Sequence, residues 1–509
     1  MRFLRLPWLH LSVVLLVYGL LLLPTVRRQG ISWDEQTDIT IARAYLTQPE
    51  GWLVGSQIDL SQTRLPMAVV ALVYTLLHTS DLITARLVSC LVGGLTLIAV
   101  YVYCRQRYDH ARGLLAAGLL ATSPFFLSFA RVAFTETDIY LACTLAWLLV
   151  CVTRFEDHPT LSRAAWVGVM LGLSLSAKFT ALAIFPVVWY AVAQSKSWSL
   201  GRRQCTTSLL YIVAFISGLA WLVFFVTPPE HLINPGILDS IAARFHHEMT
   251  FNPRFIIESV ALHIFSIVFK SSPLIGVGLL LSPVIAVLGW RRRVIRFPAL
   301  LVLCYFGGLL SLPLAQTFYT IPVLPILAVF TADQYLKLLS RRRLAAIGLA
   351  TLALALLAVD LYRCYPDYNL NGYQWLGSRQ IAGRASIGYR SVVQTPSDGV
   401  EQSIAWLNDH ARFNERVLAY LLPWHIVQAV APHPVYRLDN GFQGTLFSNP
   451  DYVVVEINAQ IPQSWWTNAS AGIVFRDPYD SDWLNANYIK VFSVPRAFGI
   501  EMASVWCKK

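Results

Sequence analysis

Long apolar runs separated by short polar stretches fill residues 1–362 of this chain. A run of about 20 apolar residues is long enough to cross the hydrocarbon core of a bilayer as a helix. By that criterion the pattern predicts about eleven transmembrane helices. They are expected at 8–26, 82–104, 113–130, 139–153, 163–177, 179–194, 206–226, 273–290, 297–313, 317–336 and 344–362. The first run ends without a small-residue cleavage site, so we interpret it as a retained helix rather than a signal peptide.

The apolar runs stop after Tyr362. In the following part, Arg416–Tyr420 and Tyr452–Ile457 have the composition of strands bounded by turn residues, and Ser403–His410 predicts a helix. We therefore expect a polytopic α-helical membrane domain up to residue 362, followed by a small soluble α/β domain over 363–509.

Composition supports a membrane protein and argues against a nucleic-acid partner. The chain is 56% hydrophobic and 14% charged, whereas a soluble protein has about 45–50% apolar and about 25% charged residues. The net charge of +11 is carried by short basic clusters between apolar runs, which is how membrane topology is encoded. The eight cysteines show no metal-binding spacing.

The basic clusters fall at alternate turns between the predicted helices. They are Arg2/Arg5, Arg105/Arg107/Arg112, Arg154/Arg163, Lys196/Arg202/Arg203, Arg291/Arg292/Arg293/Arg296 and Lys337/Arg341/Arg342/Arg343. Under the positive-inside rule these turns and the N-terminus are cytoplasmic, and an odd number of helices then puts the C-terminal domain on the exoplasmic side. That compartment permits disulfides, but the sequence leaves open whether Cys364 and Cys507 pair.

Three predicted loops, 27–81, 131–138 and 227–272, emerge on the exoplasmic side. Asp34 and Glu35 lie in the first loop, Arg131, Glu136 and Asp138 in the second and Lys270 in the third, and Lys178 lies between two apolar runs at the same face. An isolated acidic pair is usually a solvated loop. Ionisable groups that converge on one side of a membrane instead predict a functional site at that surface.

Several motifs carry a family resemblance. The segment Trp33-Asp34-Glu35-Gln36-Thr37-Asp38-Ile39, followed by Ala42-Arg43, resembles the first exoplasmic loop of the C-type superfamily of membrane glycosyltransferases, and most closely its protein O-mannosyltransferase and aminoarabinose transferase branch. Further similar motifs follow in the same order: Arg131 with Glu136 and Asp138, Gly172 to Lys178, Lys270-Ser-Ser-Pro273, and Phe318-Tyr319 with Pro322 and Pro325.

The resemblance implies the C-type fold and an inverting transfer of a sugar from a polyprenyl-monophosphate donor to a hydroxyl of an exoplasmic protein, lipid or glycan. It assigns the general base to Asp34, with Glu35 and Glu136 as the other candidate catalytic carboxylates. Arg64, Lys178, Arg131 and Lys270 are candidates to bind the donor phosphate. Three of them have an alternative role: the two lysines as helix-end residues whose ammonium groups reach water, and Arg131 as an ion-pair partner of Glu136.

The chain departs from the family pattern after the first loop. The family commonly has an acidic or polar residue, then Lys or His, then Pro-Pro-Leu, whereas this chain has Thr63-Arg64-Leu65-Pro66-Met67. Arg64 keeps the positive charge, but the acid is absent unless Asp59 substitutes for it. The sequence therefore predicts no certain cofactor and leaves a divalent metal open. In the second loop the spacing favours Glu136 over Asp138 without excluding either.

Two other function classes are weaker. A transporter or flippase for lipid-linked sugars often shows internal repeats and ionisable residues at the bilayer midplane, and no repeat is visible here. A structural scaffold would leave the one-sided cluster of charges unexplained. We expect an integral membrane protein, and the short first loop favours a prokaryotic inner membrane.

Overall fold

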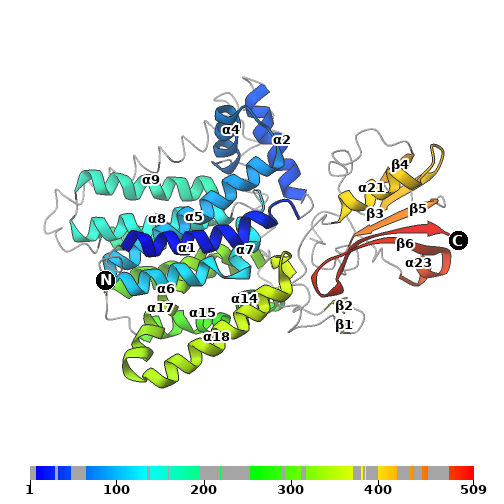
Figure 1. The fold of residues 1–509 in the computed structure, drawn as a ribbon. Coiled ribbons are helices and arrows are strands. Elements are labelled where there is room, and N and C mark those ends of the chain that lie inside the picture. Colours follow the sequence, from blue (N-terminus) through cyan, green and yellow to red (C-terminus); the bar gives the residue numbers. More distant parts are fainter. Residues whose placement is uncertain are drawn as a thin grey trace.

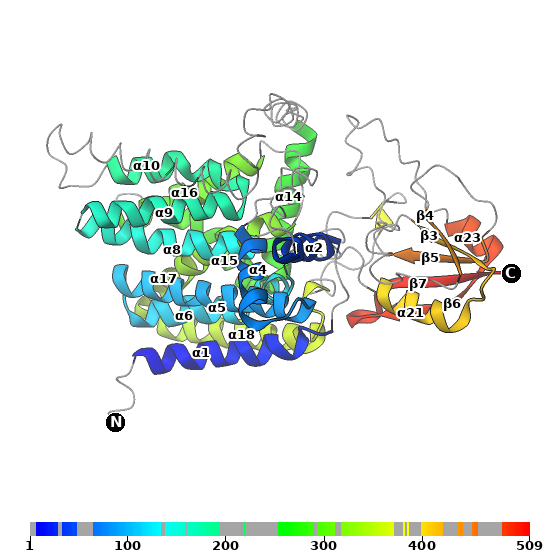
Figure 2. The same ribbon diagram turned by 90° about the horizontal axis from the view of Figure 1, so that it is seen from above.

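The computed structural model of this chain describes residues 7–28, 33–47, 65–133, 138–158, 160–193, 215, 218, 253–288, 293–310, 317–370, 380–381, 384–385, 399–420, 436–440, 450–456 and 481–509. Most helices run roughly side by side in a bundle, and the strands lie together beyond one end of it (Figures 1 and 2). We call this end of the bundle the sheet-facing end and the opposite end the far end.

The first half of the bundle contains seven helices and two 3-10 turns that position the site. They are α1 (Pro7–Leu22), η2 (Leu23–Thr25), α5 (Leu82–Arg107), α6 (His110–Ala121), α7 (Pro124–Ala130), α8 (Asp138–Asp157), α9 (Leu161–Ala177), η4 (Phe179–Ile184) and α10 (Phe185–Ala193). Two further helices, α2 (Trp33–Thr47) and α4 (Leu65–Leu77), lie at the sheet-facing end (Figure 1).

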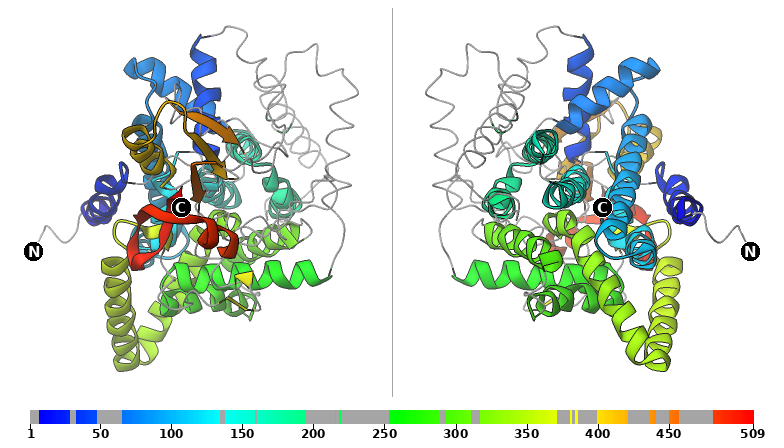
Figure 3. Two further views of the ribbon diagram at one scale, coloured as in Figure 1. Left: turned by 90° about the vertical axis from the view of Figure 1, so that its right-hand side faces the viewer. Right: turned by 90° about the vertical axis from the view of Figure 1, so that its left-hand side faces the viewer.

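The second half of the bundle is again mostly helical. Its elements are α14 (Pro253–Lys270), α15 (Pro273–Leu288), α16 (Arg293–Leu310), η5 (Thr317–Val323), α17 (Leu324–Arg341), α18 (Arg343–Cys364) and the short turn η6 (Tyr368–Leu370). Helices α1 and α18 lie at the outside of the bundle (Figure 3). Most of their residues are not buried by other parts of the protein, as expected of helices that face lipid.

The predicted helical membrane fold is confirmed, and most predicted helices coincide with observed ones. Among the described residues, five helices are long and apolar enough to span a membrane: Trp8–Thr25, Leu82–Arg107, Asp138–Asp157, Thr317–Arg341 and Arg343–Cys364. The other apolar helices are shorter, so the predicted number of spans stays a prediction. Of the helix expected at 206–226, only residues 215 and 218 are described.

Three segments differ from the simple pattern. The predicted loop 27–81 contains the helices α2 and α4. The expected span 113–130 is two helices, α6 and α7, which meet at an angle of 67°. The break follows from Ser123, which caps α7, and Pro124 at its first position, where a proline starts a helix well but cannot continue one. The predicted loop 227–272 contains α14, which the sequence pattern missed because Glu258, His263 and Lys270 interrupt its apolar residues.

Helix α5 begins where its sequence predicts. The Asp81 carboxylate accepts a hydrogen bond from the backbone N–H of Thr84 at 2.8 Å, the usual arrangement of a helix N-cap. Partial burial opposes ionisation of Asp81, but hydrogen bonds from Thr79 and Thr84 hold the pKa of its carboxyl below its usual range. The cap fixes the first turns of α5, which carry Arg86 into the site described below.

The strands form a five-stranded mixed sheet with the order β4-β3-β5-β7-β6. Its members are β3 (Arg416–Tyr420), β4 (Arg437–Asn440), β5 (Tyr452–Glu456), β6 (Tyr488–Pro495) and β7 (Glu501–Lys508), and a separate pair joins β1 (Gln380–Ile381) to β2 (Arg384–Ala385). Strand β3 pairs in parallel with β4 and β5, while β7 is antiparallel to β5 and β6. The predicted strands at 416–420 and 452–457 are thus confirmed.

Both faces of this sheet are covered. Helix α21 (Val400–His410) packs Val400, Ile404 and Leu407 against one face, where Val454 lies. Helix α23 (Ser481–Asn487) packs Leu484 with side chains of the other face. Because successive side chains of a strand alternate between faces, the apolar run of β5 fills both cores. All described cysteines are free thiols, Cys364 and Cys507 included.

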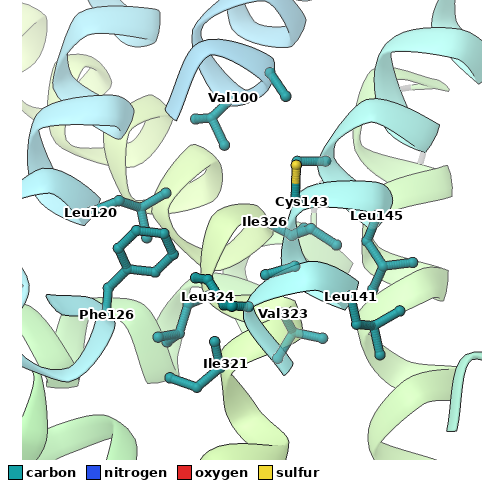
Figure 4. Close-up of a cluster of buried hydrophobic side chains, with 14 of the residues drawn as sticks. Val100, Leu120, Phe126, Leu141, Cys143, Leu145, Ile321, Val323, Leu324 and Ile326 are labelled. Atoms are coloured by element: carbon teal, nitrogen blue, oxygen red, sulfur yellow. The ribbon is translucent and has the colours of Figure 1, made fainter. Parts of the chain in front are cut away.

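Three basic residues of the far end are paired with acids. Arg112 and Lys337 share Asp333 on α17, and Arg107 pairs with Glu156 and Asp157 at the end of α8. Between the two ends lies an apolar core, in which Leu120, Phe126, Leu141 and Ile321 are among the buried side chains (Figure 4). This core holds η5 against α8, and η5 supplies aromatic rings to the site.

Candidate active site

The Asp-Glu pair lies in the first turn of α2, at the sheet-facing end. Carboxylates in the first turn of a helix are favoured by its partial positive charge. Successive positions on a helix are about 100° apart, so positions 34 and 35 lie on different faces of α2. The structure describes the Glu35 side chain, which is fully buried; the Asp34 side chain lies outside the described part.

Glu35 is fixed by three hydrogen bonds. Nε and Nη2 of Arg86 donate to its two carboxylate oxygens, each at 2.8 Å, and the backbone N–H of Ala133 donates to Oε1 at 2.7 Å. Arg86 also donates to the carbonyl of Val26 at 2.7 Å. The bidentate pair therefore ties α2 to α5, to the end of α1 and to the segment after α7, and Glu35 acts as an anchor of these elements.

Arg86 is the residue of the site that sequence reasoning missed. It lies within the predicted span 82–104, and the apolar residues around it made the whole segment read as an ordinary membrane helix. A usable signal was present, because an arginine inside an apolar helix requires a partner that faces the protein interior. The identity of that partner depends on packing between residues 51 positions apart.

Asp138 and Lys178 form a second buried pair. Asp138 begins α8 and Lys178 ends α9, and Lys178 Nζ lies 2.6 Å from Asp138 Oδ2. The same ammonium group lies 4.1 Å from the ring centroid of Tyr319 and 5.1 Å from that of Phe318, both in η5. Three motifs that the sequence singled out separately thus meet at one point. The Lys178 side chain is 12% exposed and its ammonium group is paired with Asp138, so the helix-end alternative stays open for this residue.

Lys270 ends α14 and is also buried, with 1% of its surface exposed. Its Nζ lies 5.8 Å from the ring centroid of Phe125. Phe125 contacts Phe129, which in turn contacts Phe318, with centroids 5.8 and 6.2 Å apart. Lys270 and Lys178 therefore adjoin one aromatic cluster, and the burial of Lys270 contradicts the alternative that it reaches water.

Arg131 caps the C-terminal end of α7 and is buried. Its Nη1 donates to the carbonyl of Pro366, and its guanidinium carbon lies 5.5 Å from the ring centroid of Tyr368. The alternative partner from sequence, Glu136, lies outside the described residues, as do Asp59 and Arg64. In the part of the chain that is described, no three His, Cys, Asp or Glu side chains are grouped to hold a metal ion.

Comparisons with known proteins agree with this architecture. Residues 63–222 match the family described as dolichyl-phosphate-mannose-protein mannosyltransferase. No curated protein sequence matches the chain. Among solved structures, ArnT from Cupriavidus metallidurans bound to undecaprenyl phosphate is similar, with a TM-score of 0.55 at 15% identity over 98% of this chain and 97% of that one. The apo form of ArnT gives a TM-score of 0.54 at 13% identity.

A more distant similarity joins the chain to the apo oligosaccharyltransferase of Archaeoglobus fulgidus, with a TM-score of 0.51 at 11% identity over 99% of this chain and 74% of that one. The chain is thus an integral membrane protein with the fold of the C-type glycosyltransferases. Its resemblance to the branch that contains protein mannosyltransferases and ArnT is confirmed. The matched family segment includes Arg86, Arg131, Asp138 and Lys178.

Proposed function

We propose that this protein is an inverting glycosyltransferase that moves a sugar from a polyprenyl-monophosphate donor to a hydroxyl of an exoplasmic protein, lipid or glycan. One observation supports it most. Ionisable side chains from α2, α5, α7, α8, α9 and α14 gather at the sheet-facing end of an apolar bundle. Buried ionisable groups in membrane proteins mark substrate sites.

The reaction needs a base and a cationic site. The acceptor hydroxyl loses its proton to the base as its oxygen bonds to the anomeric carbon, and the bond from that carbon to the phosphate oxygen breaks. Polyprenyl phosphate leaves from the opposite face, which inverts the anomeric centre. We assign the base to Asp34 and keep Glu136, with Asp138 as its alternative, as a second carboxylate, from the predicted loop 131–138.

The remaining residues have two kinds of role. Lys178, Lys270 and Arg64 are proposed to stabilise the departing phosphate, because charge-assisted hydrogen bonds to an anion are about twice as strong as neutral ones. Glu35 is proposed to position α2 rather than to take a proton, since both of its oxygens are already bonded. If the reaction uses a divalent metal, Asp59 is the proposed carboxylate ligand.

The proposed orientation follows from the charges. The far end carries Arg105, Arg107, Arg163 and the cluster Arg341–Arg343, so we assign it to the cytoplasm and the sheet to the exoplasmic side. We place the protein in a prokaryotic inner membrane. The soluble α/β domain over 363–509 would then stand above the membrane on the side where the acceptor arrives.

The function is tested with purified protein in liposomes that contain a labelled polyprenyl-phosphate sugar. Release of polyprenyl phosphate together with a labelled acceptor supports the proposal, and a parallel reaction with EDTA tests for a metal. Movement of the donor between leaflets without any release would overturn it in favour of the flippase alternative. No turnover across mannose, aminoarabinose and other pentose and hexose donors would also refute it.

Lys178 offers a test of donor binding. Lys178→Met is expected to raise the KM for the donor about 10- to 100-fold, because a hydrogen bond to a charged group contributes about 1.5–3 kcal/mol. Lys178→Arg should retain part of this affinity. The matched control is Lys337→Met, which removes a paired lysine at the far end and should leave the KM unchanged. An unchanged KM in Lys178→Met would remove Lys178 from the phosphate site.

A further inference from the structure

The short turn after α18 contacts both the helices and the sheet. On the helix side, Pro366 accepts the hydrogen bond from Arg131, and the Tyr368 ring lies against the same guanidinium. The hydroxyl of Tyr368 donates to the carbonyl of Leu21 in α1 at 2.9 Å. Tyr368 is fully buried, so this turn is part of the packed sheet-facing end of the bundle.

On the sheet side, Asp367 makes the connection. Its Oδ2 accepts a hydrogen bond at 3.0 Å from the backbone N–H of Ala497. Ala497 begins η10 (Ala497–Gly499), the turn that joins β6 to β7. Asp367 is itself 8% exposed, and this part-buried hydrogen bond holds the edge of the sheet to the end of α18.

The segment 131–133 contacts both the turn after α18 and helix α2. At one end, Arg131 is held by residues 366–368, which we call the coupling turn. Two residues later the N–H of Ala133 is bound by Glu35 of α2, the helix that carries Asp34. Five residues further along the chain, Asp138 holds Lys178. Segment 131–133 therefore joins the sheet to the proposed base helix.

We propose that the coupling turn makes the docked sheet a positioning element of the active site, with Arg131 as the positioning residue that receives it. In this arrangement the guanidinium of Arg131 is bound by the coupling turn. Arg131 then affects the site by fixing the backbone of residues 131–133, whose Ala133 N–H binds Glu35. The kinetic consequences rest on the proposed glycosyltransferase function, whereas the structural coupling does not.

Asp367→Ala tests the coupling from the helix side. It is expected to lower kcat about 10- to 100-fold, since small displacements of reacting groups have effects of that size, and to leave the KM for the lipid donor nearly unchanged. Asp367→Asn should restore kcat, because the amide oxygen can still accept the N–H of Ala497. A KM that rises while kcat holds would overturn the proposal, because it would show that the coupling turn affects donor binding and not the positions of the reacting groups.

Ala497→Pro tests the same hydrogen bond from the sheet side. Proline suits the first position of a helical turn, and Arg496 before it has an extended backbone that tolerates a following proline. Only the N–H is removed, so this variant should reproduce the loss of kcat in Asp367→Ala. Glu501→Gln, which breaks an exposed ion pair on the sheet, is the control and should keep full activity.

Amide hydrogen exchange gives a result that does not depend on catalysis. In Asp367→Ala and Ala497→Pro, exchange of the peptide that contains Ala133 should accelerate at least tenfold relative to Glu501→Gln. Unchanged exchange in both variants would refute the coupling. If the wild-type protein transfers no sugar, the proposed function fails, and the exchange rates still decide whether the sheet and segment 131–133 are linked.

Discussion

Asp34→Asn is expected to lower the rate of sugar transfer by about 10²–10⁴-fold, the usual contribution of a general base. This corresponds to about 3–5 kcal/mol of transition-state stabilisation. Asparagine has nearly the shape of aspartate but cannot take the proton of the acceptor hydroxyl. The loss should therefore appear in kcat, with little change in the KM of the donor. The measurement is a time course of labelled sugar on the acceptor.

The control for this variant is Asp157→Asn. Asp157 lies at the far end of α8 and pairs with Arg107 near the surface, so the same chemical change there should leave transfer intact. Both variants must elute as folded protein of unchanged thermal stability. Transfer by Asp34→Asn at the wild-type rate would show that another group, with Glu136 the next candidate, takes the proton.

Much of the fold follows from local sequence signals. Helix α5 was predicted at 82–104 and observed at Leu82–Arg107, because a long apolar run follows a capping aspartate. Strand β3 coincides with its predicted range, since an apolar segment between turn residues has few alternatives. By contrast, α14 contains ionisable residues within an apolar helix, and local hydropathy could not distinguish it from a loop.

The site was only partly predictable for a related reason. Residue types and their order pointed to Glu35, Lys178 and Lys270, with Asp138 as a secondary candidate after Glu136, but not to their partners. Arg131 illustrates the limit. Its hydrogen bond to Pro366 joins residues 235 positions apart, and only the packing of α7 against the turn after α18 brings them together. Sequence offered Glu136 as its partner because Glu136 is near in the chain.

The pair of Glu35 and Arg86 carries the largest expected effect on stability. Removing one partner of a buried ion pair leaves an uncompensated charge and costs about 3–5 kcal/mol. Glu35→Leu and Arg86→Met should each lower the free energy of unfolding by about this amount. The exposed pair of Lys490 and Glu501 is the comparison, since breaking a surface pair costs about 0–1 kcal/mol. Thermal unfolding in detergent measures Glu35→Leu, Arg86→Met and, for the exposed pair, Glu501→Gln.

The double variant Glu35→Leu with Arg86→Met separates stability from positioning. With both charges gone, no buried charge is left alone, so much of the lost stability should return. Activity should not return, because the N–H of Ala133 still lacks the carboxylate that holds segment 131–133 against α2. A double variant that recovers both stability and transfer would mean that this pair contributes packing but does not position the active site. Recovery of stability alone would show that Glu35 holds α2, the helix that carries Asp34, against segment 131–133.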